Sequence, residues 1–220
     1  MNRSKKPCVL IAKTPDMTPG AIIAWGRNTK KRVEYADRYK NEADKVNALF
    51  AQIVLGECLE QFLNHRVTAE EVEIAKTKTG QPYLEAFPEL YVSISHTEGM
   101  IGVALAEEPI GIDVQRIRGV RESLLRRTLS EREECMVRHR DDWDKPFSML
   151  WAMKEAIVKM RGTGFVEFPN NIDLSGIIVP TEDGFLAQED AVYEGHGIYT
   201  YWEDDVAVCI YGPNNGFEFF

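Results

Sequence analysis

The sequence predicts an α+β fold made of two similar halves, 1–108 and 109–220, each a small antiparallel sheet packed with a long helix. Two observations predict it. A long apolar-periodic segment followed by a late pair of β-rich runs occurs once in each half. The β-rich runs come as hairpins and do not alternate with helices, which argues against a doubly wound parallel sheet. The repeat is one of pattern and not of residues, and Glu107-Glu108-Pro109 marks the break.

The first half is expected to hold two short buried strands, a long helix, a turn and a hairpin. The helix is predicted because apolar residues recur at three- and four-residue steps from Val46 to Leu63 and form one stripe. The hairpin is predicted because Glu98-Gly99 separates two β-rich runs. The ranges are 9–12 and 21–25 for the strands, 46–63 for the helix, 79–82 for the turn, and 91–95 and 101–105 for the hairpin.

The second half opens on a predicted strand and closes on a second hairpin. Between them, an apolar set over about 145–160 predicts a helix. The acidic residues 203–205 separate the two last β-rich runs. The ranges are 110–114 for the strand, and 198–202 and 206–211 for the hairpin.

Composition and charge exclude several classes of protein. The chain has 220 residues, 44% hydrophobic and 28% charged, which is ordinary globular composition and unlike a disordered, collagen-like or disulfide-stapled chain. The net charge of −9 is uneven, because all 26 Lys and Arg precede residue 162 while eleven of the 35 Asp and Glu follow it. The first 161 residues carry +2 and can hold an anion, whereas nucleic acid is not an expected partner.

The four cysteines stand singly, without metal-ligand or C-x-x-C spacing, which favours free thiols in a reducing cytosol. The apolar run at 9–12 is too short for a signal peptide or a membrane span. We therefore expect a cytoplasmic protein with no membrane partner.

Asp113 is the first candidate for chemistry. It interrupts the apolar strand Gly111-Ile112-Asp113-Val114-Gln115 and points away from Ile112 and Val114. A carboxylate inside an apolar strand needs a partner, and a divalent metal is one. The alternative is a carboxylate on a solvated sheet face.

Glu155 is the second candidate, in the helical run from Trp151 to Lys159. Lys154 and Glu155 interrupt an otherwise apolar helix, and Lys159 lies one turn from Glu155. Such a carboxylate could bind a metal or accept a proton while the lysines neutralise phosphate. The alternative is an ordinary surface pair of Glu155 and Lys159.

The third candidate is the Ser95-His96 pair at a strand end, which could hold a phosphate or be a structural turn histidine. Basic clusters at 27–32 and 116–127 would meet an anionic ligand or an acidic partner, or are solvated surface. Because the chain has no glycine-rich phosphate loop, any nucleotide would be bound by other means.

Four motifs in order, however, resemble one family. They are Gly80-Gln81-Pro82-Tyr83, Ser93-Ile94-Ser95-His96, Gly111-Ile112-Asp113 and Trp151-x-x-Lys154-Glu155-Ala156. Each motif is weak alone, but the four together resemble the 4′-phosphopantetheinyl transferases of the Sfp type. The motif block covers 79–164, and the length fits the whole chain.

The resemblance implies two similar α+β halves, with coenzyme A bound in the cleft between them. It implies Mg²⁺-dependent transfer of the phosphopantetheine arm to a serine of an apo acyl or peptidyl carrier protein, with release of adenosine 3′,5′-bisphosphate. A duplicated chain would make a monomer sufficient. The alternative is a non-catalytic module that binds coenzyme A or a carrier protein.

The resemblance also implies roles for individual residues. Asp113 and Glu155, both in the second half, bind magnesium, and Glu155 is the proposed general base for the carrier serine. At the position of a further acidic ligand in many members, either the Gln115 amide oxygen coordinates the metal or water takes its place. Lys154 and Lys159 contact phosphates. The residues expected to bind coenzyme A are Lys31, Lys45, Gly80, Gln81, Pro82, Ser95, His96, Asp113, Lys154 and Lys159, with Lys159 counted as catalytic too.

In three places this sequence departs from the family pattern, and each departure weakens the electrostatic attraction for magnesium or for the phosphates. Gln115 stands where many members have a second acidic ligand, and Gln81 where a lysine is common. The helix arginine of the first half has its best counterpart in Lys45, with Lys31 as an additional contact. We expect weaker magnesium affinity and a looser hold on the phosphates.

Overall fold

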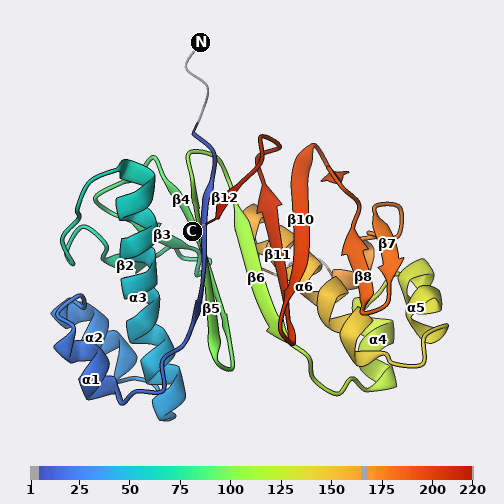
Figure 1. The fold of residues 1–220 in the computed structure, drawn as a ribbon, viewed down its shortest axis with the longest axis horizontal. Helices are drawn as coiled ribbons and strands as arrows, with labels where there is room; N and C mark the ends of the chain where they lie inside the picture. Colours follow the sequence, from blue (N-terminus) through green and yellow to red (C-terminus); the bar gives the residue numbers. More distant parts are fainter. Residues whose placement is uncertain (1–4, 165–167, 220) are drawn as a thin grey trace. The chain divides into compact units, whose positions relative to one another are not determined.

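The chain, described here from a computed structural model over residues 5–164 and 168–219, has a mixed α+β architecture (Figure 1). This confirms the predicted fold class. Two compact units divide it: unit 1 comprises Met1–Ile110 with Gly216–Phe220, and unit 2 comprises Gly111–Asn215. Each unit contains one four-stranded sheet and one long helix. The predicted division into two equivalent halves stays a prediction.

Unit 1 builds its sheet in the order β12-β1-β5-β4, with β1, β5 and β4 antiparallel and β12 parallel to β1. Strands β4 and β5 form the predicted hairpin. A two-stranded sheet, β2-β3, is not hydrogen-bonded to it but contacts it through β3 and β4. The bounds are β1 Cys8–Lys13, α1 Pro19–Ala24, α2 Lys30–Ala36, α3 Glu42–Leu63, β2 Ile74–Lys76, β3 Pro82–Leu84, β4 Tyr91–Thr97, β5 Met100–Ala106 and β12 Glu218–Phe219.

The strand predicted over residues 21–25 is wrong, because this segment forms helix α1. Thr18 caps the helix by accepting a hydrogen bond from the Ala21 N–H, and Pro19 occupies the first turn, where its missing N–H costs nothing. Ile22 is fully buried whereas Trp25 is 47% exposed, so the apolar run is not a buried strand.

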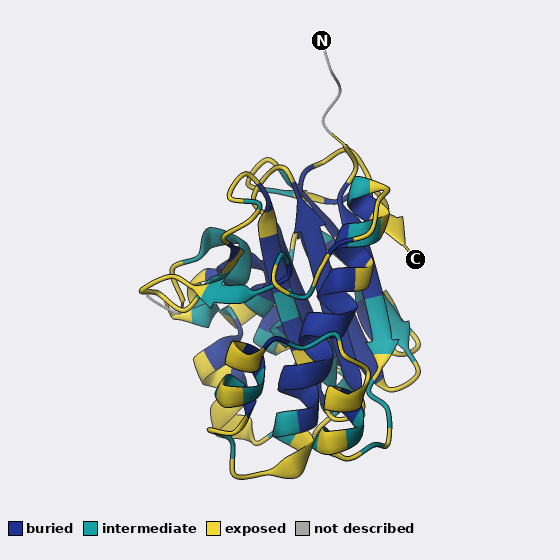
Figure 2. Cartoon of the chain, turned by 90° about the vertical axis from the view of Figure 1, so that its left-hand side faces the viewer, coloured by how far each residue is buried: buried dark blue, intermediate teal, exposed yellow. Residues whose placement is uncertain are grey.

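Helix α3 confirms the predicted long helix but is apolar on more than one face. It packs on β1 and β5 and is covered by α1 and α2, so most of its residues from Val46 to Leu59 are buried. Figure 2 shows exposed residues, in yellow, gathered in outer helices and loops around buried segments. The helix is long and apolar enough to cross a membrane, but 78% of that window is buried in the protein, as in a core helix.

Unit 2 has the antiparallel sheet β6-β11-β10-β9 and a two-stranded sheet, β7-β8. The predicted strand, helix and hairpin of this half are confirmed as β6, α6 and β10-β11. The bounds are β6 Gly111–Arg116, α4 Glu122–Thr128, α5 Glu131–Arg138, α6 Asp144–Arg161, the 3₁₀ turn Pro169–Asn171, β7 Ile178–Thr181, β8 Gly184–Ala187, β9 Val192–Tyr193, β10 His196–Glu203 and β11 Val206–Gly212.

Helix α6 crosses β6 at unusually close range, and Gly111 is the reason that it can. A Cβ atom at Gly111 would lie 1.9 Å from the Ala156 carbonyl oxygen and 2.8 Å from the Met160 nitrogen. No side chain fits such a space. Residues that follow Gly111 on β6 and residues of α6 on either side of Ala156 are therefore brought together.

Replacing Gly111 by alanine is expected to force α6 away from β6 and to lower the free energy of unfolding by about 1–3 kcal/mol or more. Urea denaturation followed by circular dichroism measures the change. Gly119→Ala is the matched control, because a Cβ there would have no heavy atom within 4 Å. Equal losses in the two variants would contradict the close-approach account.

Candidate active site

Asp113 and Lys159 form the first contact of the candidate site, within unit 2. Asp113 lies on β6 and is 6% exposed. The Lys159 ammonium group, on α6, donates hydrogen bonds to Asp113 Oδ1 at 2.7 Å and to the Ile112 carbonyl oxygen at 3.2 Å. The buried carboxylate thus has a cationic partner. The solvated-face interpretation of Asp113 is wrong, because the strand buries this residue against α6.

Glu155 is the second carboxylate of the site and has an unusual acidity. Burial, and then the negative charge of Asp113, raise its pKa from 4.5 to about 7, while Lys159 acts in the opposite direction. Among the described residues Glu155 makes no hydrogen bond or ion pair. The surface ion pair with Lys159, which was the alternative interpretation, is therefore not formed. A half-buried carboxylate with this pKa can accept a proton near neutral pH.

Gln115 follows Asp113 on the same face of β6. The nitrogen of its side-chain amide donates a hydrogen bond to the Arg116 carbonyl oxygen at 2.8 Å. The oxygen of the same amide can therefore accept a hydrogen bond or coordinate a metal. No cluster of three His, Cys, Asp or Glu residues suited to a metal occurs within residues 5–164 and 168–219. Two carboxylates and an amide oxygen nevertheless suit magnesium, which prefers oxygen ligands and usually takes one or two carboxylates plus substrate phosphates. The mutual repulsion that raises the Glu155 pKa is what a cation would relieve.

Lys154 requires a correction, because the predicted phosphate contact does not fit its surroundings. Its side chain is fully buried, and its ammonium group donates to Glu133 Oε2 at 2.6 Å and to the carbonyl oxygens of Pro169 and Ile172 at 3.0 and 2.6 Å. An ammonium group has three N–H donors, and all three are used. Lys154 is therefore a structural residue of unit 2.

Glu133, on α5, is the partner that sequence reasoning missed. Its carboxylate also accepts the N–H groups of Ser130 and Leu174, both at 2.8 Å. The Ser130 hydroxyl accepts the Glu133 N–H in return, which completes a capping box. The pattern Ser130-x-x-Glu133 was the available signal. It predicts the cap, but it does not reveal that the glutamate is buried against Lys154.

In unit 1, the turn carrying Gly80, Gln81 and Pro82 is confirmed, and its shape depends on glycine. Gly80 has φ +89°, a conformation that L side chains rarely adopt. The Thr77 N–H donates to the Gln81 carbonyl oxygen at 2.9 Å, and Pro82 begins β3. The other residues of unit 1 that were predicted to bind coenzyme A lie on β4, α2 and α3.

Ser95 and His96 occupy opposite faces of β4, the serine buried and the histidine exposed. The structure therefore does not bring their side chains together as a pair. Lys31 is exposed on α2. Lys45, on α3, forms an ion pair with Asp37 at 3.3 Å, which partly neutralises its charge. Sequence reasoning missed a third cation, Lys76, which donates to the Tyr35 hydroxyl at 2.9 Å next to the glycine turn.

The comparisons with known proteins bear on the segment that holds Asp113 and Glu155. Residues 109–210 match the model of the 4′-phosphopantetheinyl transferase superfamily. The predicted resemblance to these transferases is thereby confirmed for this segment.

Individual relatives agree with this. The chain is 31% identical to a 4′-phosphopantetheinyl transferase of Bacillus subtilis over 144 residues, 61% of each chain. It is 22% identical to the 4′-phosphopantetheinyl transferase Sfp of Bacillus subtilis strain 168, over 60% of this chain and 58% of the relative. It is 25% identical to the 4′-phosphopantetheinyl transferase gsp of Aneurinibacillus migulanus, over 62% and 56%. The chain thus spans about six tenths of the length of the curated relatives it matches.

The buried pair of Lys154 and Glu133 predicts a large loss of stability when one partner is removed. Lys154→Met is expected to lower the free energy of unfolding by about 3–5 kcal/mol, because the Glu133 carboxylate would stay buried without its cation. Lys145→Met is the control, since the Lys145–Asp183 pair is solvent-exposed and contributes little to stability. Similar urea midpoints for the two variants would refute the structural role.

The acidity of Glu155 predicts how stability varies with pH. Because its folded pKa is raised to about 7 from 4.5, the folded protein binds more protons than the unfolded chain between these values, and this carboxyl lowers stability as pH rises. Glu155→Gln is therefore expected to gain about 1–2 kcal/mol over the parent at pH 8, discounted for partial exposure, and nothing at pH 4.

Denaturation at both pH values measures this difference. Glu57→Gln, at an exposed position of α3, should show no such dependence. A Glu155→Gln gain that is the same at pH 4 and pH 8 would rule out a raised pKa.

Proposed function

We propose that the protein transfers the 4′-phosphopantetheine arm of coenzyme A to a serine hydroxyl of an apo acyl or peptidyl carrier protein, in the manner of the Sfp-type transferases. The observation that carries this proposal is the Asp113–Glu155–Lys159 cluster, with a carboxyl of pKa about 7, inside the segment that matches the superfamily. Adenosine 3′,5′-bisphosphate is the expected leaving product.

Glu155 is the residue that we assign as the general base, and its raised pKa supports this. Its carboxylate accepts the proton of the carrier serine, so that the serine oxygen can attack the phosphorus atom that bears the pantetheine arm. The nucleophile comes from the partner protein. This explains why no nucleophile is needed among the side chains of the site.

Lys159 neutralises charge that develops on the phosphate oxygens. Two of its three N–H donors are taken by Asp113 and the Ile112 carbonyl oxygen, which leaves one for a phosphate. Asp113 therefore orients the ammonium group. Lys154, which has no donor left, takes no part in this step.

Magnesium fits the same oxygens. Asp113 and Glu155, with the Gln115 amide oxygen, would hold it, and when bound it supplies charge stabilisation on the pyrophosphate oxygens. In unit 1, Lys31, Lys76 and the Gly80 turn are the groups that we assign to coenzyme A. We further propose that the protein acts as a monomer in the cytoplasm.

A mass measurement tests the function. The protein is incubated with coenzyme A, magnesium chloride and a panel of apo carrier proteins, and the carriers are expected to gain the mass of one phosphopantetheine. Chelation of magnesium by EDTA should stop the gain. No gain on any carrier would overturn the proposal, and coenzyme A binding without any gain would favour the non-catalytic module.

Removal of either carboxylate is expected to slow the transfer by about 10²-fold or more, because general-base catalysis by Glu155 contributes at least that much and loss of Asp113 removes the group that orients Lys159. The variants are Glu155→Gln and Asp113→Asn, and initial rates are read from the carrier mass. Glu131→Gln, exposed on α5, is the control and should keep the parent rate. Unchanged rates in both site variants would refute the assigned site.

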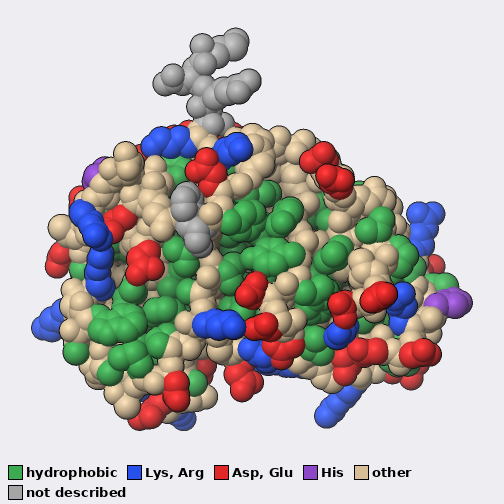
Figure 3. Space-filling model, in the orientation of Figure 1, with side chains coloured by type: hydrophobic (Ala, Val, Ile, Leu, Met, Phe, Trp, Pro, Cys, Tyr) green, Lys and Arg blue, Asp and Glu red, His purple; other side chains and the backbone are tan. Residues whose placement is uncertain are grey.

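Helix α4 is the surface that we propose for carrier docking. Arg121 and Arg127 are exposed there beside Leu124, which is 39% exposed. Arg126 is also exposed, and its guanidinium group forms ion pairs with Glu122 and Glu134. Figure 3 shows acidic and basic side chains interspersed at this end of unit 2. Carrier proteins are usually acidic, so an arginine-rich surface with an apolar residue suits them.

Reversal of charge at all three arginines (Arg121→Glu, Arg126→Glu and Arg127→Glu) is expected to raise the KM for the carrier at least about tenfold and to leave the KM for coenzyme A unchanged. The control reverses the same number of charges at exposed residues of unit 1, namely Lys13, Lys40 and Arg66. An unchanged carrier KM in the arginine variant would remove α4 as the docking surface.

A further inference from the structure

Two thiols lie against each other in unit 1, and neither belongs to a residue assigned to the transfer reaction. Cys8 is the first residue of β1, and Cys58 lies near the end of α3. Their sulfur atoms are 2.9 Å apart, and both residues are at most 1% exposed. A disulfide bond is about 2.05 Å long, so less than about 1 Å of further approach would join them.

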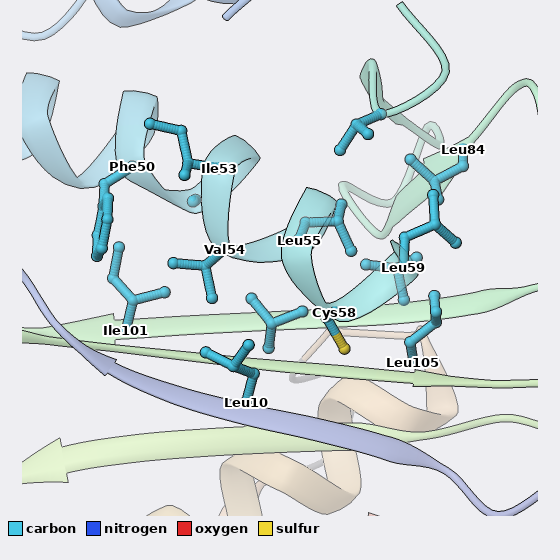
Figure 4. Packing of buried hydrophobic residues seen from close by; sticks show 14 of the residues in the cluster. Leu10, Phe50, Ile53, Val54, Leu55, Cys58, Leu59, Leu84, Ile101 and Leu105 are labelled. Atoms are coloured by element: carbon cyan, nitrogen blue, oxygen red, sulfur yellow. The ribbon is translucent and has the colours of Figure 1, made fainter. Parts of the chain in front are cut away.

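The backbone around the pair holds both side chains toward one another. The Cys8 thiol donates to the Cys58 carbonyl oxygen at 3.4 Å, and the Cys58 sulfur lies 3.6 Å from the Cys8 carbonyl oxygen. Figure 4 shows the Cys58 sulfur directed from α3 toward the sheet. The two thiols are thus fixed in contact by the packing of α3 on β1.

We propose that Cys8 and Cys58 form a redox modification site, at which hydrogen peroxide converts the two thiols into a disulfide. The Cys8 thiolate attacks the peroxide oxygen and becomes a sulfenic acid, with one water released. The Cys58 sulfur then displaces the sulfenic oxygen as a second water and forms the S–S bond. Two thiols lose two electrons and two protons, and hydrogen peroxide is reduced to two waters.

Access to the pair is controlled by the short strand β12. Cys8 pairs with Glu218 on this strand, and the Glu218 N–H donates to the Pro7 carbonyl oxygen at 2.9 Å. Within residues 168–219, two residues of β12 pair with β1 and both are exposed, so this edge of the sheet opens readily. Release of β12 frees the end of β1 that carries Cys8 and admits the oxidant.

The hydrogen bond with the Cys8 thiol, followed by burial, raises the pKa of Cys58 well above its ordinary value, which keeps this thiol protonated and unreactive while the sheet is closed. The thiols of Cys209 and Cys135 serve as comparisons. Cys209 is buried in unit 2 without a thiol neighbour among the described residues, and Cys135 is exposed on α5. Oxidation to an intramolecular disulfide is expected at the pair in unit 1 and not at these residues.

The test uses the full chain with Cys135→Ser, which removes the exposed thiol, and a second version that ends at residue 215. Both are treated with hydrogen peroxide, unfolded, alkylated and digested. The mass of the protein is expected to fall by two hydrogens, with Cys8 and Cys58 found in one linked peptide that dithiothreitol separates. The version without β12 is expected to form this link at least about tenfold faster.

Cys58→Ala is the control for specificity and must abolish the linked peptide. If Cys8 and Cys58 stay alkylatable in both versions after oxidation, the modification site is overturned. If the link forms at the same rate with and without β12, the control of access by that strand is overturned. Neither outcome depends on the transferase activity.

Discussion

The space that Gly111 leaves open is the constraint on which the candidate site depends. With no Cβ at this position, the Ala156 carbonyl oxygen approaches β6 to a distance that any side chain would block. This contact packs Glu155 of the helix beside the strand that carries Asp113, and burial first, then the charge of Asp113, raise the Glu155 pKa to about 7. The glycine is thus a structural condition for the acid–base chemistry and not a flexible link.

Two lysines of α6 show how one helix serves both stability and chemistry. Lys154 lies on the interior side, where Glu133 and two carbonyl oxygens use every donor. Lys159, five residues later, reaches across to β6 and stays 28% exposed. The first joins α6 to α5 and to the segment near residue 170, and the second keeps a donor for an anion. A buried, fully satisfied ion pair is rigid, so the turn of α6 that carries Glu155 is held in one position.

Much of this could be predicted from the sequence, because it rests on short-range patterns. The hairpins and long helices follow from β-rich runs with turns and from apolar periodicity, and the G-I-D and W-x-x-K-E-A motifs identified Asp113 and Glu155. The failures come from tertiary context. An apolar run alone did not distinguish a strand from the capped helix α1. Helix α3 is covered by the sheet on one side and by α1 and α2 on the other, so its apolar residues are not confined to a single stripe.

The fate of Lys154 shows the same limit. Its neighbours in sequence suggest a charged group beside the phosphates, but its partners Glu133 and the 169–174 segment are distant in the chain. The net charge of −9 likewise says little about the site, since the assigned residues lie in the part with a small positive balance. Only the fold decides which charges meet.

A carbon-13 NMR titration of the Glu155 carboxyl carbon, in the parent and in Gly111→Ala, tests the central claim most directly. The account predicts a pKa of about 7 in the parent. It predicts a fall toward the ordinary value of 4.5 when the added Cβ separates α6 from β6. A Glu155 pKa near 4.5 in the parent, or one that is the same in both proteins, would contradict it.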